Sequence, residues 1–309
     1  MGCYVCVGLD PDAAQIPEFA QTDKHIPTNI LRFVKNVVDM THHVAAAYKP
    51  QIAYYEEWGS QGLRVLEQVC EYIRQVNPLI PIIIDAKRAD IGRTSEAYVR
   101  ALLDRLDADA VTVNPYLGME AVKPFLDMTD RHIIVLCRTS NPGAGELQDV
   151  MCTPYEEEST GRYFATVAEA LREGAANVIP CDPMPLYQFV ALRVTSWNVH
   201  GNCAVVVGAT APQELEDVRI LVGEDMLILV PGVGKQGGDL REVIRRGSGE
   251  TWLGEIINNS SAIMFAYKSL KKPDGSSYDQ TEWMSATHQA ATDMNSQIED
   301  LIYEDLSVR

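Results

Sequence analysis

The chain has 309 residues, of which 46% are hydrophobic, so it is long enough to bury the core of one large domain or two smaller ones. Its formal net charge of -17 opposes the binding of nucleic acids, which proteins hold mainly through clustered Lys and Arg. No apolar run reaches the roughly 20 residues that span a bilayer, and no basic leader precedes the first apolar segment. We therefore expect a soluble, unsecreted protein with neither a membrane nor a nucleic-acid partner.

Seven cysteines are scattered along the chain, mostly in apolar runs, which is typical of a protein kept in the reducing cytoplasm. Cys3 and Cys6 match the C-x-x-C spacing of metal sites, but a strand places positions three apart on opposite faces. The histidines form no H-x-H or H-E-x-x-H pair. The sequence therefore predicts no metal site.

Eight short apolar runs rich in β-branched residues recur along the chain, and segments with helical periodicity separate them. Strands alternating with helices require parallel crossovers, and eight such units can close into a (β/α)8 TIM barrel. A doubly wound open sheet is the alternative. The predicted strands are 4–9, 44–49, 80–87, 110–114, 132–137, 203–207, 226–230 and 255–260, and the predicted helices include 30–41, 62–75, 95–106, 212–222 and 239–246.

Two segments depart from this regular spacing. Residues 152–185, after the fifth strand, read as an insertion with a helical stretch of its own at 161–173. Residues 271–277 form a Pro/Gly/Ser linker, and a helix-like tail follows at 281–306. We therefore expect a barrel over residues 1–270 that carries the insertion, then a linker and C-terminal helical extension over 271–309.

Charged residues mark the end of the third predicted strand, where Asp85 and Lys87 share one face and Asp90 follows in the loop. Buried strands seldom carry unpaired charges, and in a barrel this end is the mouth where active sites are built. A lysine between carboxylates stays protonated, so it can act as a general acid while the carboxylates repel an anionic substrate group. A purely structural network of ion pairs is the alternative.

Other strand ends add to this mouth. Asp10 follows the first strand and Lys49 ends the second, and four charges of two signs around one mouth favour a site over separate ion pairs. The polar loop at 139–145 suggests a lid. The seventh strand runs into a glycine-rich loop, 231–239, which occurs too late for a dinucleotide fingerprint but suits a phosphate held by backbone N–H groups. A tight turn without a ligand is the alternative.

The run Asp-Ala-Lys-Arg-Ala-Asp-Ile-Gly-Arg-Thr, from Asp85 to Thr94, closely resembles the signature of the orotidine 5'-monophosphate decarboxylase family. The closest likeness is to its longer bacterial branch. The resemblance covers residues 4–267 apart from the insertion, in the family's order, and the supporting segments are 7–11, 47–51, 113–118, 138–145, 206–210 and 230–234.

The resemblance implies a homodimer of barrels that converts the pyrimidine nucleotide orotidine 5'-monophosphate into uridine 5'-monophosphate, in de novo pyrimidine biosynthesis, without a metal or cofactor. By motif position, Lys87 protonates C6 of the substrate and Asp85 stresses its carboxylate. The remaining implied roles are ribose and charge-network contacts for Asp10 and Lys49, contacts with the partner's site for Asp90, Ile91 and Thr94, a pyrimidine contact for Ser140, and phosphate contacts for Gln236 and the loop of Gly234.

The sequence departs from the family pattern at the end of the eighth strand. Ser261 stands where the family's longer branch has an Arg that grips the phosphate, and Lys235 stands where the family usually has a small residue. Two alternatives follow. One is a relative that acts on another pyrimidine nucleotide or an unphosphorylated nucleoside, and the other is a non-catalytic nucleotide-binding barrel. We expect Lys235 to replace part of the missing positive charge.

Overall fold

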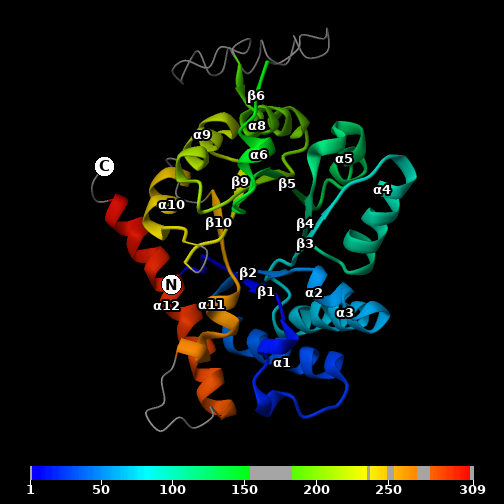
Figure 1. Ribbon diagram of the computed structural model, residues 1–309, viewed down its shortest axis with the longest axis vertical. Helices are drawn as coiled ribbons and strands as arrows, with labels where there is room; N and C mark the ends of the chain where they lie inside the picture. The colour runs from blue at the N-terminus through cyan, green and yellow to red at the C-terminus, as the bar shows by residue number, and fades with distance from the viewer. Residues whose placement is uncertain (1, 154–182, 235–236, 249–253, 270–278, 307–309) are drawn as a thin grey trace.

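The computed structural model describes residues 2–153, 183–234, 237–248, 254–269 and 279–306. Its main sheet holds eight parallel strands in the order β2-β1-β10-β9-β8-β5-β4-β3. Parallel bridges from Tyr48 to Ile82 and from Gln51 to Asp85 join the two outer strands, so the sheet closes into a barrel (Figure 1). The predicted barrel is confirmed and the open sheet was wrong. The strands are β1 (Val5–Leu9), β2 (Ala45–Pro50), β3 (Ile83–Arg88), β4 (Ala110–Val113), β5 (His132–Arg138), β8 (Cys203–Val207), β9 (Leu227–Pro231) and β10 (Glu255–Asn259).

Helices cover the outside of the barrel (Figure 1). The longer ones are α1 (Ile26–Thr41), α3 (Gly59–Val76), α4 (Gly92–Val99), α5 (Met119–Leu126), α8 (Leu186–Trp197), α9 (Pro212–Val222) and α10 (Leu240–Gly247). A π-helical segment, Arg100–Arg105, continues α4. Three single-turn helices, α2 (Ala53–Glu56), α6 (Gly145–Gln148) and α11 (Ser261–Met264), follow strand ends, and short 3-10 segments occur at Ala13–Gln15, Glu18–Ala20, Pro115–Leu117 and Ala266–Ser269.

Local chemistry accounts for several helix starts. Asp239 caps α10 by accepting hydrogen bonds from the backbone N–H groups of Arg241 and Glu242. Pro212 occupies the first turn of α9, where its missing N–H has no partner to lose. The first residue of each helix sets the end of the loop before it. The loops after β8 and β9, which border the barrel mouth, are therefore limited by the starts of α9 and α10.

Alternation along the strands divides the core into two layers. Val5 and Val7 of β1 pack in the large cluster formed with the helices, whereas Cys6 between them points into the barrel. The barrel interior is filled by apolar side chains from most of the strands, including Ile83, Ile134, Val206 and Leu229. The barrel is thus a packed core with a floor, and any ligand must bind above that floor.

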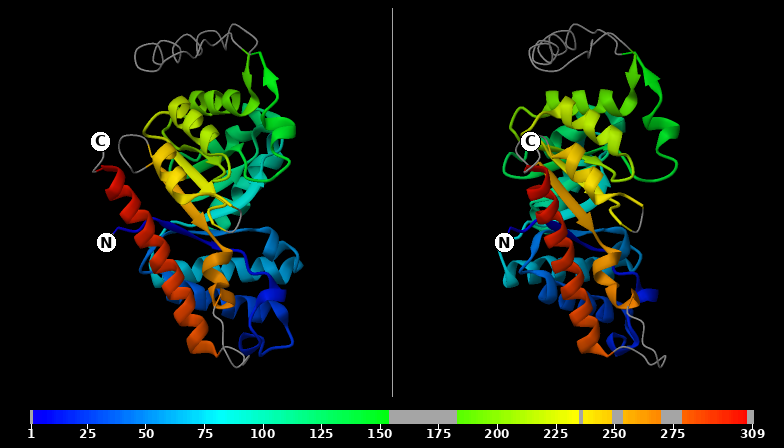
Figure 2. Two further views of the ribbon diagram at one scale, coloured as in Figure 1. Left: turned by 60° about the vertical axis from the view of Figure 1, so that its left-hand side comes forward. Right: turned by 90° about the vertical axis from the view of Figure 1, so that its left-hand side faces the viewer.

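The C-terminal helix α12 (Gln280–Leu306) packs against both α1 and α10, and Figure 2 shows it running along the outside of the barrel. Trp283 is fully buried, and its ring packs in a tilted arrangement against that of Phe33 of α1, with 5.2 Å between the ring centroids. Asn295 accepts a hydrogen bond from the backbone N–H of Tyr4 at 2.7 Å and donates one to the carbonyl of Gly2 at 2.8 Å. α12 therefore fills the gap in the helix ring between α10 and α1. The domain boundary that we predicted at residue 270 lies outside the described residues.

The ends of the predicted insertion lie side by side. β6 (Met151–Cys152) pairs in antiparallel fashion with β7 (Met184–Pro185), so the chain leaves the barrel and returns at one place (Figure 2). The helical stretch expected at 161–173 and the linker at 271–277 lie outside the described residues.

The described residues also bear on membrane crossing and on metal binding. Among the described helices, none is both long and apolar enough to cross a bilayer. Within the same residues, no three His, Cys, Asp or Glu side chains gather as a metal site would require. Cys3 is exposed while Cys6 is buried inside the barrel, so the two thiols do not face a common ligand.

Candidate active site

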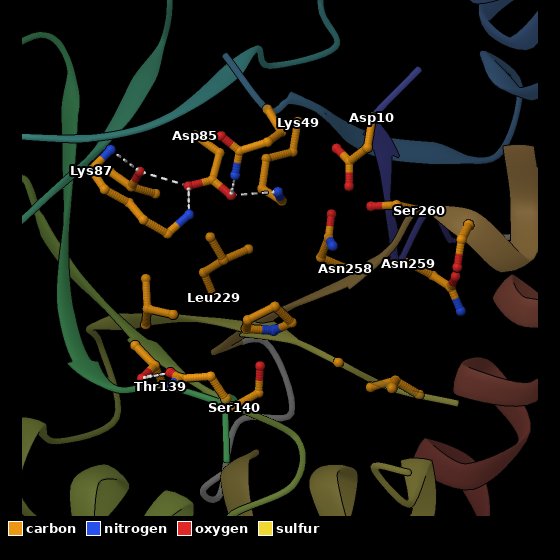
Figure 3. A pocket seen from close by; sticks show the side chains of 18 of the residues that line it. Asp10, Lys49, Asp85, Lys87, Thr139, Ser140, Leu229, Asn258, Asn259 and Ser260 are labelled. Atoms are coloured by element: carbon orange, nitrogen blue, oxygen red, sulfur yellow. Dashed lines mark hydrogen bonds and ion pairs between the residues drawn. The ribbon is translucent and has the colours of Figure 1, made fainter. Parts of the chain in front are cut away.

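A cavity of about 770 Å³ opens at the carboxyl end of the strands (Figure 3). Strand ends and the loops that follow them supply its walls, as expected for a barrel enzyme. Asp10, Lys49, Asp85, Lys87, Ser140 and Ser261, all singled out from the sequence, line this one cavity. The charges that lie far apart in the sequence therefore meet at one mouth.

The carboxylate of Asp85 is the centre of the charged wall. Its Oδ2 accepts hydrogen bonds from the Lys49 ammonium at 2.8 Å and from the Gln51 amide at 3.0 Å. Its Oδ1 accepts hydrogen bonds from the Lys87 ammonium at 2.5 Å and the Thr112 hydroxyl at 2.8 Å. Four donors, from β2 and the residue after it and from β3 and β4, thus hold the carboxylate in one orientation (Figure 3).

Burial and pairing set the charge states of this network. Burial alone would raise the pKa of Asp85, but the ammonium groups of Lys49 and Lys87 outweigh it and hold that pKa well below its ordinary value. Burial disfavours the charge on Lys49, yet the carboxylates of Asp85 and Asp10 raise its pKa above the ordinary value. Asp85 is therefore an anion and Lys49 a cation at neutral pH.

Lys87 is the member of the network that remains open to a ligand, because 44% of its side chain is exposed whereas only 4% of the Lys49 side chain is. Its backbone has φ of 50°, in the left-handed region that non-glycine residues rarely adopt. The pairing of β3 with β4 shifts register between Ile84 and Arg88, which marks a bulge at this position. The bulge replaces the regular strand that we expected and turns Lys87 toward the cavity.

Apolar side chains adjoin these charges. Leu136 of β5, Val206 of β8 and Leu229 of β9 line the same cavity, and Val206 and Leu229 are buried. A charge beside such a wall acts in a low effective dielectric, where its field is screened far less than in water. The site can therefore place a fixed ammonium and a fixed carboxylate against a reacting group with little competition from solvent.

Several polar side chains lie around Asp10, apart from the network of Asp85. Burial raises the pKa of this carboxyl, against the opposing effects of Lys49 and of a hydrogen bond with Ser260. Its Oδ1 is buried and has no hydrogen-bond partner among the residues that the structure describes. Asn258 and Asn259, the last residues of β10, line the cavity beside it (Figure 3).

The loop after β5 forms the opposite wall. The backbone N–H of Thr139 donates to the Gln148 side-chain carbonyl at 2.8 Å, and the Thr139 hydroxyl donates to Asn141 at 2.6 Å. Ser140 lies between these residues and also lines the cavity. The loop is tied down by its own side chains, so Ser140 is held facing the charged wall (Figure 3).

The glycine-rich loop reaches the cavity through Gly232 and Val233, and Gly234 follows them. Gly232 and Gly234 have φ of 94° and 79°, so the tight turn requires glycine at both positions. Lys235 and Gln236 lie outside the described residues. Among the described residues that line the cavity, the cations are Lys49 and Lys87, both on the wall of β2 and β3.

Three predicted site residues lie elsewhere. Asp90, Ile91 and Thr94 precede or begin α4 and do not line the described cavity, and Ile91 is 61% exposed. One oxygen of the Asp90 carboxylate accepts the backbone N–H of Ile91 at 2.7 Å. Lys87 forms an ion pair with Asp85 and, among the described residues, none with Asp90. The lysine is therefore not flanked by both carboxylates of its own chain, as we had expected.

Most of this chain is similar to proteins of known function. The family model described as "Orotidine 5'-phosphate decarboxylase / HUMPS family" matches residues 4–271. The chain belongs to this family. The curated orotidine 5'-phosphate decarboxylase of Janthinobacterium sp. is 44% identical over 263 residues, 85% of this chain and 84% of that protein. The enzyme of the same name from Cellvibrio japonicus is 41% identical over the same shares of the two chains.

Solved structures agree with this assignment. The Leishmania donovani OMP decarboxylase superposes with a TM-score of 0.72 at 28% identity, over 97% of this chain and 94% of that chain. The Leishmania donovani UMP synthase superposes with a TM-score of 0.73 at 29% identity, over 97% of this chain and 53% of that chain. The decarboxylase family predicted from the motifs is confirmed.

Three site residues of this family member were missed in the sequence. Gln51 and Thr112 contact Asp85, and Asn258 lies in the wall of the cavity. Gln51 ends the segment 47–51 that supports the family resemblance, and Asn258 is a polar residue inside a predicted strand, so both left a signal. Thr112 left none, because threonine is common in ordinary strands.

Proposed function

We propose that this protein decarboxylates orotidine 5'-monophosphate to uridine 5'-monophosphate using only its own side chains. One observation carries the proposal: the Lys87 ammonium and the Asp85 carboxylate lie 2.5 Å apart at the mouth of the barrel, beside an apolar wall. The named relatives are orotidine 5'-phosphate decarboxylases, which supports the same reaction.

Asp85 and Lys87 have different roles in the reaction. The bond between C6 of the pyrimidine and its carboxylate breaks, carbon dioxide leaves, and C6 keeps the electron pair. Asp85 raises the energy of the bound carboxylate by repulsion, and Lys87 stabilises the negative charge that develops at C6. The Lys87 ammonium then gives its proton to C6, and the neutral amine regains a proton from solvent.

The rest of the substrate takes the remaining positions. Asp10 and Lys49 contact the ribose, while Lys49 also holds Asp85. Ser140, on the opposite wall, contacts the pyrimidine ring. The phosphate binds at the far side of the cavity, and the residues proposed for it are Gly234, Lys235, Gln236 and Ser261.

We further propose a homodimer with shared active sites. Asp90, Ile91 and Thr94 would serve the cavity of a second copy, since they do not line the cavity of their own chain. Large apolar side chains nearby favour such a contact, because Tyr116 is 82% exposed and Leu117 is 50% exposed. The cytoplasm is the proposed location, on the strength of the scattered cysteines.

The reaction is tested by following the loss of orotidine 5'-monophosphate absorbance with the purified protein. We expect the wild type to turn over, and Lys87→Ala to lose nearly all activity while still binding uridine 5'-monophosphate, because the lysine acts chiefly in the transition state. Retention of a substantial rate by Lys87→Ala would overturn the role of the lysine. Tight binding by the wild type without turnover at any pH would favour the non-catalytic alternative.

A second candidate function rests on Ser261. This residue lines the cavity where the family's longer branch places a phosphate-binding Arg, and a serine brings no charge. A relative acting on a different pyrimidine nucleotide or an unphosphorylated nucleoside would fit that change. Activity on such a compound, together with no activity on orotidine 5'-monophosphate, would establish this alternative.

A further inference from the structure

Arg138 is a largely buried cation near the mouth of the barrel, and the proposed reaction does not use it. It is the last residue of β5, only 12% of its side chain is exposed, and it does not line the described cavity. The pairing of β5 with β8 shifts register between Leu136 and Arg138, which marks a bulge. The guanidinium is directed to the loop that follows β5, where all its recorded partners but one lie.

The guanidinium joins the two ends of this loop. Its Nε lies 3.0 Å from Asp149 Oδ1, and its Nη2 donates a hydrogen bond to Asp149 Oδ2 at 3.1 Å. Its Nη1 donates to the carbonyl of Thr139 at 3.1 Å. The remaining partner is Glu214 of α9, whose Oε1 lies 3.7 Å from Nη2. A planar fork that meets a carboxylate through two nitrogen atoms fixes the geometry of the pair more closely than a point charge does.

A second side-chain pair lies directly beside the first. The backbone N–H of Thr139 donates to Gln148 Oε1 at 2.8 Å, and Gln148 Nε2 donates to the Thr139 hydroxyl at 2.8 Å. Arg138 and Thr139 are thus joined to Asp149 and Gln148, and we call these four residues the clasp. The clasp closes the loop 140–147 at its base.

Ser140 is the first residue inside the clasp, and it has little room to move. A Cβ atom at Gly208, in the loop after β8, would lie only 2.6 Å from Ser140 Cβ, so the two chains approach closely. The Ser140 carbonyl also accepts a hydrogen bond from the Thr210 hydroxyl at 3.3 Å. The loop after β8 therefore bounds Ser140 on one side. Ser140 follows Thr139 directly, so a shift of the clasp must move it within the cavity wall (Figure 3).

We propose that Arg138 is a positioning residue, which acts through the clasp to hold Ser140 against the pyrimidine ring of the substrate. The inference rests on the proposed function, which assigns the ring contact to Ser140. Arg138 touches no ligand itself, because its guanidinium lies outside the cavity and is directed to Asp149 and the Thr139 carbonyl. Loss of Arg138 should therefore weaken recognition of the ring and spare the ribose and phosphate contacts, which other strands supply.

The test compares two ligands on the full-length protein: uridine 5'-monophosphate, which carries the ring, and ribose 5-phosphate, which does not. Arg138→Met should bind uridine 5'-monophosphate about tenfold more weakly than wild type, the effect of one lost hydrogen bond. Its affinity for ribose 5-phosphate should equal that of wild type. Arg138→Lys should recover part of the loss, because an ammonium pairs with Asp149 but lacks the fork.

Arg131→Met is the matched control. Arg131 directly precedes β5 at the other end of the barrel, where its Nη2 donates to Asp107 at 2.9 Å and its Nη1 donates to the Ala108 carbonyl at 3.2 Å. This variant loses the same kinds of contact as Arg138→Met, but it should bind both ligands as wild type does. Asp149→Ala removes the other charge of the clasp and should reproduce the effect of Arg138→Met, so it carries the test if the arginine variant does not fold.

Ser140→Ala gives a readout that general damage to the fold would not move. If Arg138 acts through Ser140, adding Arg138→Met to Ser140→Ala should weaken uridine 5'-monophosphate binding no further. Additive losses in the double variant would overturn the proposal. An equal loss of affinity for both ligands in Arg138→Met would do the same, as would wild-type affinity for uridine 5'-monophosphate in both Arg138→Met and Asp149→Ala.

Turnover of orotidine 5'-monophosphate and binding of uridine 5'-monophosphate by wild type are measured on the same preparation. If wild type does neither, the proposed function fails, and the inference about Arg138 fails with it. If wild type does both and the Arg138 variants show one of the contrary results, only the positioning role is lost.

Discussion

The hydroxyl of Thr112 accepts a hydrogen bond from the backbone N–H of Lys87 at 2.9 Å. The same hydroxyl donates to Asp85 Oδ1 at 2.8 Å. The buried Thr112 hydroxyl thus connects the backbone of Lys87 to the Asp85 carboxylate, which is the ion-pair partner of the Lys87 side chain. Lys87 adopts φ of 50° at the bulge, and this tie helps to offset the cost of that conformation. Thr112 is therefore a positioning residue for both charges.

Thr112→Val should lower kcat by about ten- to a hundredfold, because it leaves the Lys87 N–H without its partner and frees Asp85 to turn. The Kd for uridine 5'-monophosphate should change little. Thr112→Ser keeps the hydroxyl and should retain kcat within a few-fold, which separates positioning from general damage to the fold. Wild-type kcat in Thr112→Val would show that the tie is dispensable.

Shared active sites predict that two inactive variants complement each other. A dimer of one Lys87→Ala and one Asp90→Ala subunit carries one site with both residues intact, so equal mixing should recover about a quarter of wild-type activity. The measurement is turnover after subunit exchange, verified by a tag on one variant. No recovery after verified exchange would contradict a site that uses Asp90 of the second copy.

A carboxyl at the end of the barrel opposite the cavity predicts that the stability of the protein depends on pH. Glu255, the first residue of β10, has a pKa raised to about 7, because burial outweighs the opposing charge of Arg219. The folded state then holds a proton that the unfolded state releases near pH 4.5, so stability falls as pH rises from about 4.5 to about 7. The loss is on the order of 3 kcal/mol for a shift of this size.

Glu255→Gln removes this titration while keeping the size of the side chain. Melting temperatures of wild type and variant should be compared at pH 5 and pH 7.5. Wild type should lose more stability than the variant between these two values, whatever the absolute effect of the substitution. Parallel curves for the two proteins would mean that the Glu255 carboxyl does not titrate in this range.

The sequence predicted the barrel because its signal is local and repeated eight times. The charged wall was also predictable, since Asp85 and Lys87 interrupt an apolar strand where barrel enzymes place their chemistry. The bulge at Lys87 was not, because it depends on the Thr112 hydroxyl from the neighbouring strand. The helix α5 was not among the named helices because it is short and contains Pro124.

The absence of an arginine at position 261 leads to the final prediction. A phosphate dianion in a protein of net charge -17 needs a local cation, yet the cations among the described lining residues, Lys49 and Lys87, belong to the Asp85 network. Backbone N–H groups and a glutamine supply dipoles without a full charge. Lys235 follows Gly234 directly in the sequence, in the loop whose residues Gly232 and Val233 line the cavity.

We therefore expect Lys235→Ala to raise KM for the phosphorylated substrate by one to two orders of magnitude, about 1.4 to 3 kcal/mol for one charge-assisted contact. Its binding of uridine, which lacks the phosphate, should be unchanged. Ser261→Arg should rescue Lys235→Ala, because a guanidinium can grip phosphate with two parallel hydrogen bonds where an ammonium acts as a point charge. If Lys235→Ala binds uridine 5'-monophosphate as tightly as wild type, the lysine does not compensate for the missing arginine. An unphosphorylated substrate then becomes the better explanation of Ser261.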